Sequence, residues 1–120
     1  MRLLIMTLTL CALTLNMTGQ AHTGLTSSEP TAGQVLHDSP NQLRLQFSTP
    51  VRLIRLELLD NDGNPVELSL HQRTQAHAVF EIPVPELNAG SHTVNWVIMG
   101  ADTHKMTGSF QFTVAGHSVD

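Results

Sequence analysis

The sequence predicts an all-β fold, a β-sandwich or a small barrel, from three observations. Apolar and polar residues alternate with a period of two in segments such as 43–48, 93–98 and 109–114, which is typical of half-buried strands. Clusters of Pro, Gly, Asn and Asp separate these segments at short intervals, as in proteins built from hairpins. No segment has the apolar spacing of a convincing amphipathic helix.

Seven short strands follow from this pattern, in the ranges 23–28, 43–48, 53–59, 66–70, 76–84, 93–98 and 109–114. Pro50 is expected to interrupt the strand pattern between the second and third strands, since proline has no backbone N–H to donate. The cluster at 60–65 predicts a hairpin turn, because a calcium EF-hand would need more ligands and flanking helices. Pro83 and Pro85 end the fifth strand, and residues 88–90 turn the chain into the sixth.

A secretory signal peptide is expected at residues 1–21. Arg2 supplies the positive charge, residues 3–15 are almost wholly apolar, and Gly19-Gln20-Ala21 places small residues at the positions that precede a cut. The apolar stretch is shorter than the ~20 residues of a membrane span. Cleavage after Ala21 would leave one domain, residues 22–120, that begins with His22. An uncleaved anchor is the alternative, and bulky Leu10 before Cys11 disfavours a lipoprotein.

The composition excludes several classes of function. The single cysteine lies in the leader, so the mature domain would have no disulfide and no thiolate metal site. The formal net charge is −4 and no basic cluster is visible along the sequence, which disfavours nucleic-acid binding. All seven histidines lie after residue 21, and this number draws attention to metal binding.

Two segments far apart in the sequence carry potential metal ligands. An N-terminal His22 can chelate a metal through its free amine and its Nδ1 atom. Asp102 and His104 are two residues apart, so their side chains would face the same side of an extended segment. Three nitrogens and at least one oxygen suit Cu(II), which prefers tetragonal nitrogen-rich sites. Zinc is the rival, because it accepts the same donors in tetrahedral geometry.

The order of motifs along the chain resembles the CopC copper-resistance family of copper-binding proteins. The matching residues are His22; Ser28, Pro30 and Gly33; Phe47 and Ser48; Gly90, Val94 and Trp96; Asp102, His104 and Gly108; and Phe112 and Val114. The resemblance implies a seven-stranded Greek-key immunoglobulin-like β-sandwich, a cupredoxin-like barrel variant, located in the periplasm. It also implies one Cu(II) ion per chain, held by His22, Asp102 and His104, and a partner, an inner-membrane CopD-like copper transporter.

Three departures from the family pattern change what is expected of the site. Thr49 stands where members often carry an acidic residue after Phe-Ser, so water could fill that position. His92 stands where an aromatic residue usually follows the Gly90 turn, and it is expected to be a structural substitute. Only Met99 and Met106 follow the leader, so we expect no dedicated Cu(I) site, which would use soft thioether ligands.

The resulting hypothesis is a periplasmic copper-binding protein for copper resistance, sequestration or delivery, and not an enzyme. An N-terminal His and a second His also occur in oxidative copper enzymes, but those need a broad substrate surface that this small chain lacks. The alternative is a metal-free immunoglobulin-like interaction module. Trp96 is expected in the core, and the remaining histidines are expected to be solvated loop or edge residues: His37, His71, His77 and His117.

Overall fold

The computed structural model describes residues 24–70 and 75–116, and this part of the chain contains strands and no helix. The strands are β1 (Leu25–Glu29), β2 (Val35–Leu36), β3 (Gln42–Leu59), β4 (Pro65–Val66), β5 (His77–Pro83), β6 (Gly90–Met99) and β7 (Lys105–Val114). The predicted all-β class is therefore confirmed.

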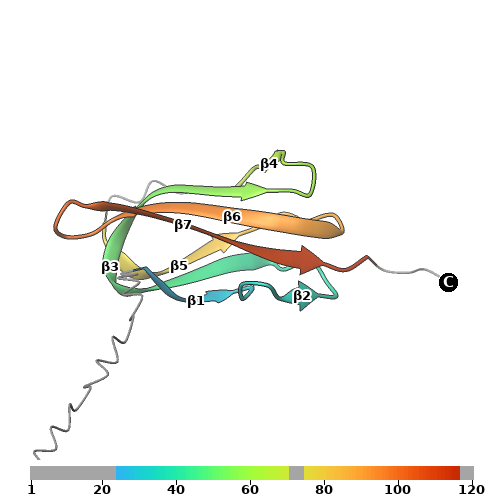
Figure 1. Cartoon of the computed structure of the whole chain (residues 1–120), viewed down its shortest axis with the longest axis horizontal. Coiled ribbons are helices and arrows are strands. Elements are labelled where there is room, and N and C mark those ends of the chain that lie inside the picture. The colour runs from blue at the N-terminus through green and yellow to red at the C-terminus, as the bar shows by residue number, and fades with distance from the viewer. Residues whose placement is uncertain (1–23, 71–74, 117–120) are drawn as a thin grey trace, which may run out of the picture.

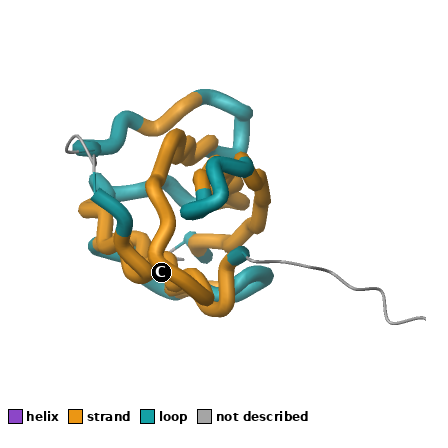
Figure 2. The backbone as a smooth tube through the Cα atoms, turned by 90° about the vertical axis from the view of Figure 1, so that its left-hand side faces the viewer, coloured by secondary structure: helices purple, strands orange, loops and turns teal. Residues whose placement is uncertain are grey.

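The long strand β3 belongs to both layers of the fold. Its first half pairs with β1 and β5, and its second half pairs with β4 and β6. Beyond β6 the second layer continues through β7 to β2, and β2 and β7 form the parallel pair of this otherwise antiparallel sheet. Figure 1 shows β3 bending at one end of the molecule, and Figure 2 shows the strands curling around a common interior.

Pro50 does not end a strand, so that expectation is wrong. β3 continues through it, but its pairing with β5 shifts between Gln46 and Val51, and its pairing with β6 begins at Arg52. Proline is tolerated where no ladder hydrogen bond needs its missing N–H. The two predicted strands at 43–48 and 53–59 are thus the two halves of one bent strand.

Two further expectations about strands need correction. Within the range 66–70, only Val66 lies in a strand, β4. Leu68 packs against the core without pairing with another strand, and this burial explains why apolar and polar residues alternate here. The two-residue β2, which pairs with β7 through Val35 and Thr113, was not expected because it is too short to show a period. The predicted turn after β3 is confirmed: Asp60 N–H donates to the Asn64 carbonyl at 2.8 Å.

The core lies between the two layers and is built from alternate residues of the long strands. Its members are Leu43, Leu45, Phe47, Val51, Leu56, Leu58, Phe80, Ile82, Leu87, Val94, Trp96, Ile98, Phe110, Phe112 and Val114. The Phe47 ring meets the rings of Trp96 and Phe80 edge to face, at centroid distances of 5.4 and 5.9 Å. Trp96 is 6% exposed, which confirms its predicted place in the core.

His92 is a buried core residue, which agrees with the structural role expected from the sequence. It is 1% exposed, and its ring stacks on Phe112 with a centroid distance of 5.5 Å and an interplanar angle of 12°. Its Nδ1 atom lies 3.1 Å from the Gly90 carbonyl oxygen, to which it can donate. Its Nε2 atom has no hydrogen-bond partner among the described residues, so the imidazole contributes to the core mainly through ring stacking.

Candidate metal centre

Asp102 and His104 lie on the loop that joins β6 to β7, at the end of the molecule where β3 bends. We call this the β6–β7 end. The loop is closed by two backbone hydrogen bonds, Gly100 N–H to the His104 carbonyl at 3.1 Å and Thr103 N–H to the Gly100 carbonyl at 3.0 Å. Thr103 has a φ of 64°, a left-handed conformation that is rare for a β-branched residue. The segment is therefore a tight turn, and the expected extended conformation is wrong.

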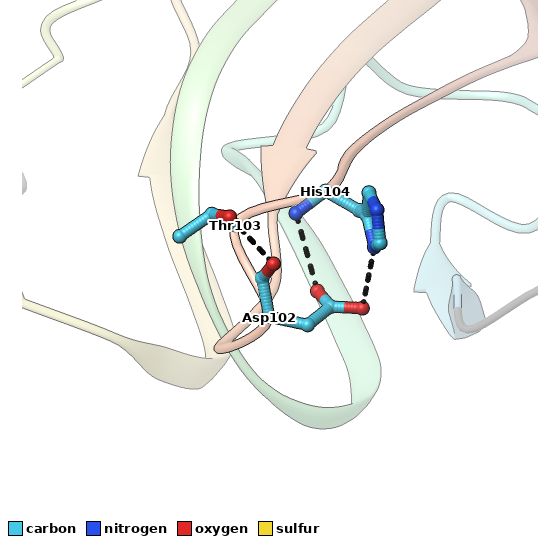
Figure 3. A network of polar contacts seen from close by, with 3 residues as sticks. All are labelled: Asp102, Thr103 and His104. Atoms are coloured by element: carbon cyan, nitrogen blue, oxygen red, sulfur yellow. Dashed lines mark hydrogen bonds and ion pairs between the residues drawn. The ribbon is translucent and has the colours of Figure 1, made fainter.

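The turn nevertheless brings the two side chains into contact (Figure 3). Asp102 Oδ2 lies 2.8 Å from His104 Nδ1, and Asp102 Oδ1 accepts the His104 backbone N–H at 3.2 Å. Both side chains are open to solvent, with exposed fractions of 66% for Asp102 and 82% for His104. The contact between the two residues agrees with the prediction from their spacing, although a different backbone geometry produces it.

The charge state of the pair follows from these hydrogen bonds. The side-chain hydrogen bond from His104, with help from its backbone N–H, holds the pKa of Asp102 below its ordinary value of 3.8. An ionised carboxylate can only accept, so Nδ1 of His104 carries the proton in this contact. In the neutral imidazole this leaves the Nε2 lone pair free to bind a metal.

The start of β1 lies at the same end of the molecule. Leu25 pairs with Phe47, and the Ser48 N–H donates to the Gly24 carbonyl at 3.4 Å, next to the bend of β3. The predicted ligand His22 lies outside the described residues. Within residues 24–70 and 75–116, no group of three His, Cys, Asp or Glu side chains is close enough to hold a metal. The described part of the chain thus brings together two of the three predicted ligands.

The other histidines and Thr49 occupy the surroundings that the sequence predicted, where they are described. His37 is exposed in a loop, and His77 is exposed on β5, which pairs only with β3. His71 and His117 lie outside the described residues. Thr49 is exposed in the bend of β3, so its position is open to water.

One feature of the β6–β7 end was not predicted from the sequence. A hollow of about 330 Å³ adjoins the β6–β7 loop, with Arg52 and Met99 side by side in its lining. These residues are far apart in the sequence and become neighbours only because β3 pairs with β6. No pattern along the chain indicates this pairing, so local spacing could not have revealed it.

Comparison with known proteins decides the family. The CopC domain family model matches residues 25–115. The chain belongs to the CopC family. Its motifs predicted this assignment, and copper binding is implied by membership. Among curated proteins, Copper resistance protein C of Escherichia coli is 29% identical over 104 residues, which cover 78% of this chain and 82% of that protein.

Solved structures of CopC proteins share this fold. The crystal structure of CopC from Methylosinus trichosporium OB3b matches with a TM-score of 0.67 and 26% identity, covering 79% of this chain and 95% of that one. PcoC, a methionine-rich copper resistance protein from Escherichia coli, matches with a TM-score of 0.64 and 27% identity, covering 75% and 95%. The predicted cupredoxin-like sandwich is therefore confirmed. No helix among the described residues is long and apolar enough to span a membrane.

Proposed function

We propose that this CopC-family protein carries one Cu(II) ion in the periplasm, after removal of residues 1–21, and serves copper resistance by sequestering the ion or delivering it. The proposed ligands are the amine and Nδ1 of His22 and the Nε2 of His104. Asp102 binds through its carboxylate or acts as the outer-shell acceptor that orients His104. The single observation that carries the proposal is the 2.8 Å contact between Asp102 and His104 on an exposed loop.

Two features support this arrangement of ligands. A carboxylate that accepts the Nδ1 proton fixes the ring and raises the basicity of Nε2, as is common around metal-bound histidines. β1 starts beside Ser48 at the β6–β7 end, and His22 lies two residues before Gly24, a reach of up to about 7 Å for an extended chain. Exposed Thr49 leaves room for water as a further ligand.

The same features favour a binding protein over an enzyme. Copper is then the cargo, and delivery requires an acceptor, for which a CopD-like inner-membrane transporter is our candidate. A metal such as Cu(II) heads the affinity order for nitrogen donors, whereas zinc would take the same donors more weakly. A metal-free interaction module would have no use for an exposed histidine oriented by a carboxylate.

A competition titration with a Cu(II) chelator, followed by EPR, tests the proposal on the chain that begins at His22. We expect one equivalent to bind tightly with a nitrogen-rich tetragonal signal. His104→Ala and His22→Ala should each weaken binding by at least about a hundredfold, through loss of a direct ligand. His77→Ala is the matched control, because His77 is also exposed at this end, and it should bind as tightly as the parent.

Two results would contradict the proposal. Equal affinity in the parent, His22→Ala and His104→Ala would mean that copper binds elsewhere or nonspecifically, and would favour the metal-free module. Tighter binding of zinc than of copper in the same competition would reject the proposed metal while keeping the ligands.

A further inference from the structure

The fold brings most of the described basic residues of this acidic protein onto one face. The described part contains four basic residues, Arg44, Arg52, Arg55 and Lys105, of which Arg44 lies in the first layer and the other three in the second. Arg52 pairs with Met99 across β3 and β6, and Met99 pairs with Lys105 across β6 and β7. Directly paired residues point to the same side of a sheet. Ile98 next to Met99 is fully buried, so this row points outward from the second layer.

A second row extends the same surface. Arg55 pairs with Val97, which also alternates with buried neighbours and therefore points outward. Arg55 is bound to Glu57 at 2.6 Å, whereas neither Arg52 nor Lys105 forms an ion pair with another described residue. We call the surface formed by Arg52, Arg55, Met99 and Lys105 the cationic face. It ends at the β6–β7 loop that carries Asp102 and His104.

Four carboxylates lie at the opposite end of the molecule. Asp60 and Asp62 lie in the turn after β3, and Asp38 and Glu86 line a hollow beside Val114, the last residue of β7. Figure 1 places the β3–β4 turn and the end of β7 on the right, away from the β6–β7 loop on the left. Three cations thus share one face and four carboxylates lie at the far end, although Glu57 and Asp102 are next to the cationic face and no basic cluster is visible in the sequence.

We propose that the cationic face is a docking surface for an acidic patch on a partner protein, which it holds beside the copper loop. The proposal rests on the proposed function, since docking here is useful because copper leaves or enters at this end. Oppositely charged surfaces steer a partner into one orientation and raise its association rate. Met99 between the cations and Ile54, which is 46% exposed, supply the apolar contacts typical of an interface centre.

A protein partner fits this surface better than a membrane does. Anionic lipids are usually bound by clusters of about four to eight basic residues, more than this face offers. The net charge of −4 would also repel an anionic bilayer once the rest of the molecule approached it. Arginine and methionine are instead enriched at protein–protein interfaces.

The test uses the copper-free chain from His22 and a capped hexaglutamate peptide as the probe, at low ionic strength. Backbone amide NMR shifts should change around Arg52, Arg55, Met99 and Lys105, and hardly change around Arg44. The double variant Arg52→Gln/Lys105→Gln should bind the peptide about fivefold more weakly. Each of the single variants Arg52→Gln and Lys105→Gln should also weaken binding, whereas Arg44→Gln, which removes one charge from the first layer, should bind like the parent, and added salt should abolish binding.

Several outcomes would overturn the docking surface. They are no binding of hexaglutamate, shifts centred on Arg44, equal loss in Arg44→Gln, or binding to phosphatidylserine-containing vesicles without binding to the peptide. Self-association that the double variant abolishes would identify a second copy of the chain as the occupant and would also overturn it. Because no copper is present, failure here leaves the copper site untouched, and the double variant should still bind Cu(II) like the parent.

Discussion

The contact between Asp102 and His104 makes a prediction about protonation. Because the carboxylate accepts two hydrogen bonds from His104, its pKa lies below 3.8, and the folded state favours the ionised form. The contact therefore contributes to the native state above the ordinary pKa and is lost as the pH falls through the lowered one. Both side chains are exposed, so the effect on the free energy of unfolding is small.

NMR titration of the Asp102 carboxyl carbon in the copper-free protein measures this directly. We expect a midpoint below 3.8 in the parent and a return towards that value in His104→Ala. A midpoint that is the same in parent and variant would mean that the two side chains do not interact in solution.

The buried imidazole of His92 makes a prediction about stability. Phenylalanine at this position keeps the stack on Phe112 and removes the Nε2 atom that lacks a partner, so His92→Phe should raise the free energy of unfolding by about 1 kcal/mol. His92→Ala should lower it by about 3 kcal/mol by opening a cavity. Denaturant unfolding followed by Trp96 fluorescence measures both.

The control for His92 is His37→Phe, which changes an exposed residue and should alter stability by less than about 0.5 kcal/mol. A loss of stability in His92→Phe would show that the Nδ1 contact with Gly90 matters more than the unsatisfied nitrogen.

At the scale of elements, alternation along the sequence was enough to identify the strands that carry the core. Phe47, Val94 and Phe110 were all placed correctly because each alternates with polar neighbours on a strand with one buried face. Alternation could not show that β3 is continuous through Pro50, since a change of pairing partner leaves no pattern in the sequence.

The backbone conformation of the turn at Asp102–His104 could not be predicted from the sequence, for a different reason. The spacing of the two side chains was informative, but a left-handed Thr103 runs against the preference of β-branched residues, so no local signal predicts it. The family resemblance named the other ligand, His22, but local spacing could not show that the start of β1 and the β6–β7 loop lie at the same end, because this depends on strand pairing.

Gly108 shows why one family motif needs glycine. Gly108 pairs with Trp96 across β6 and β7, and a Cβ atom there would overlap the indole ring. Gly108→Ala should therefore lower the free energy of unfolding by about 2 kcal/mol through overpacking. Gly116→Ala is the matched control, since its Cβ would lie 3.4 Å from that of Ala89. Equal stability of the two variants in denaturant would contradict the tight fit of Trp96.

At the scale of the whole molecule, the residues of the proposed function lie at one end. The β6–β7 loop, the bend of β3 and the start of β1 meet there, and the cationic face leads to it. Asp60 and Asp62 lie at the opposite end, in the turn after β3. Composition gave the net charge, but only strand register shows that three cations share one face, and this face is what would orient a partner.

The central claim is that the first residue of the mature chain completes a Cu(II) site with His104. The most direct measurement compares the Cu(II) affinity of the chain that begins at His22 with that of the chain that retains Ala21. One added residue moves the free amine away from the imidazole but leaves every described residue unchanged. The account predicts a sharp loss of affinity in the longer chain. Equal affinities of the two chains would contradict it.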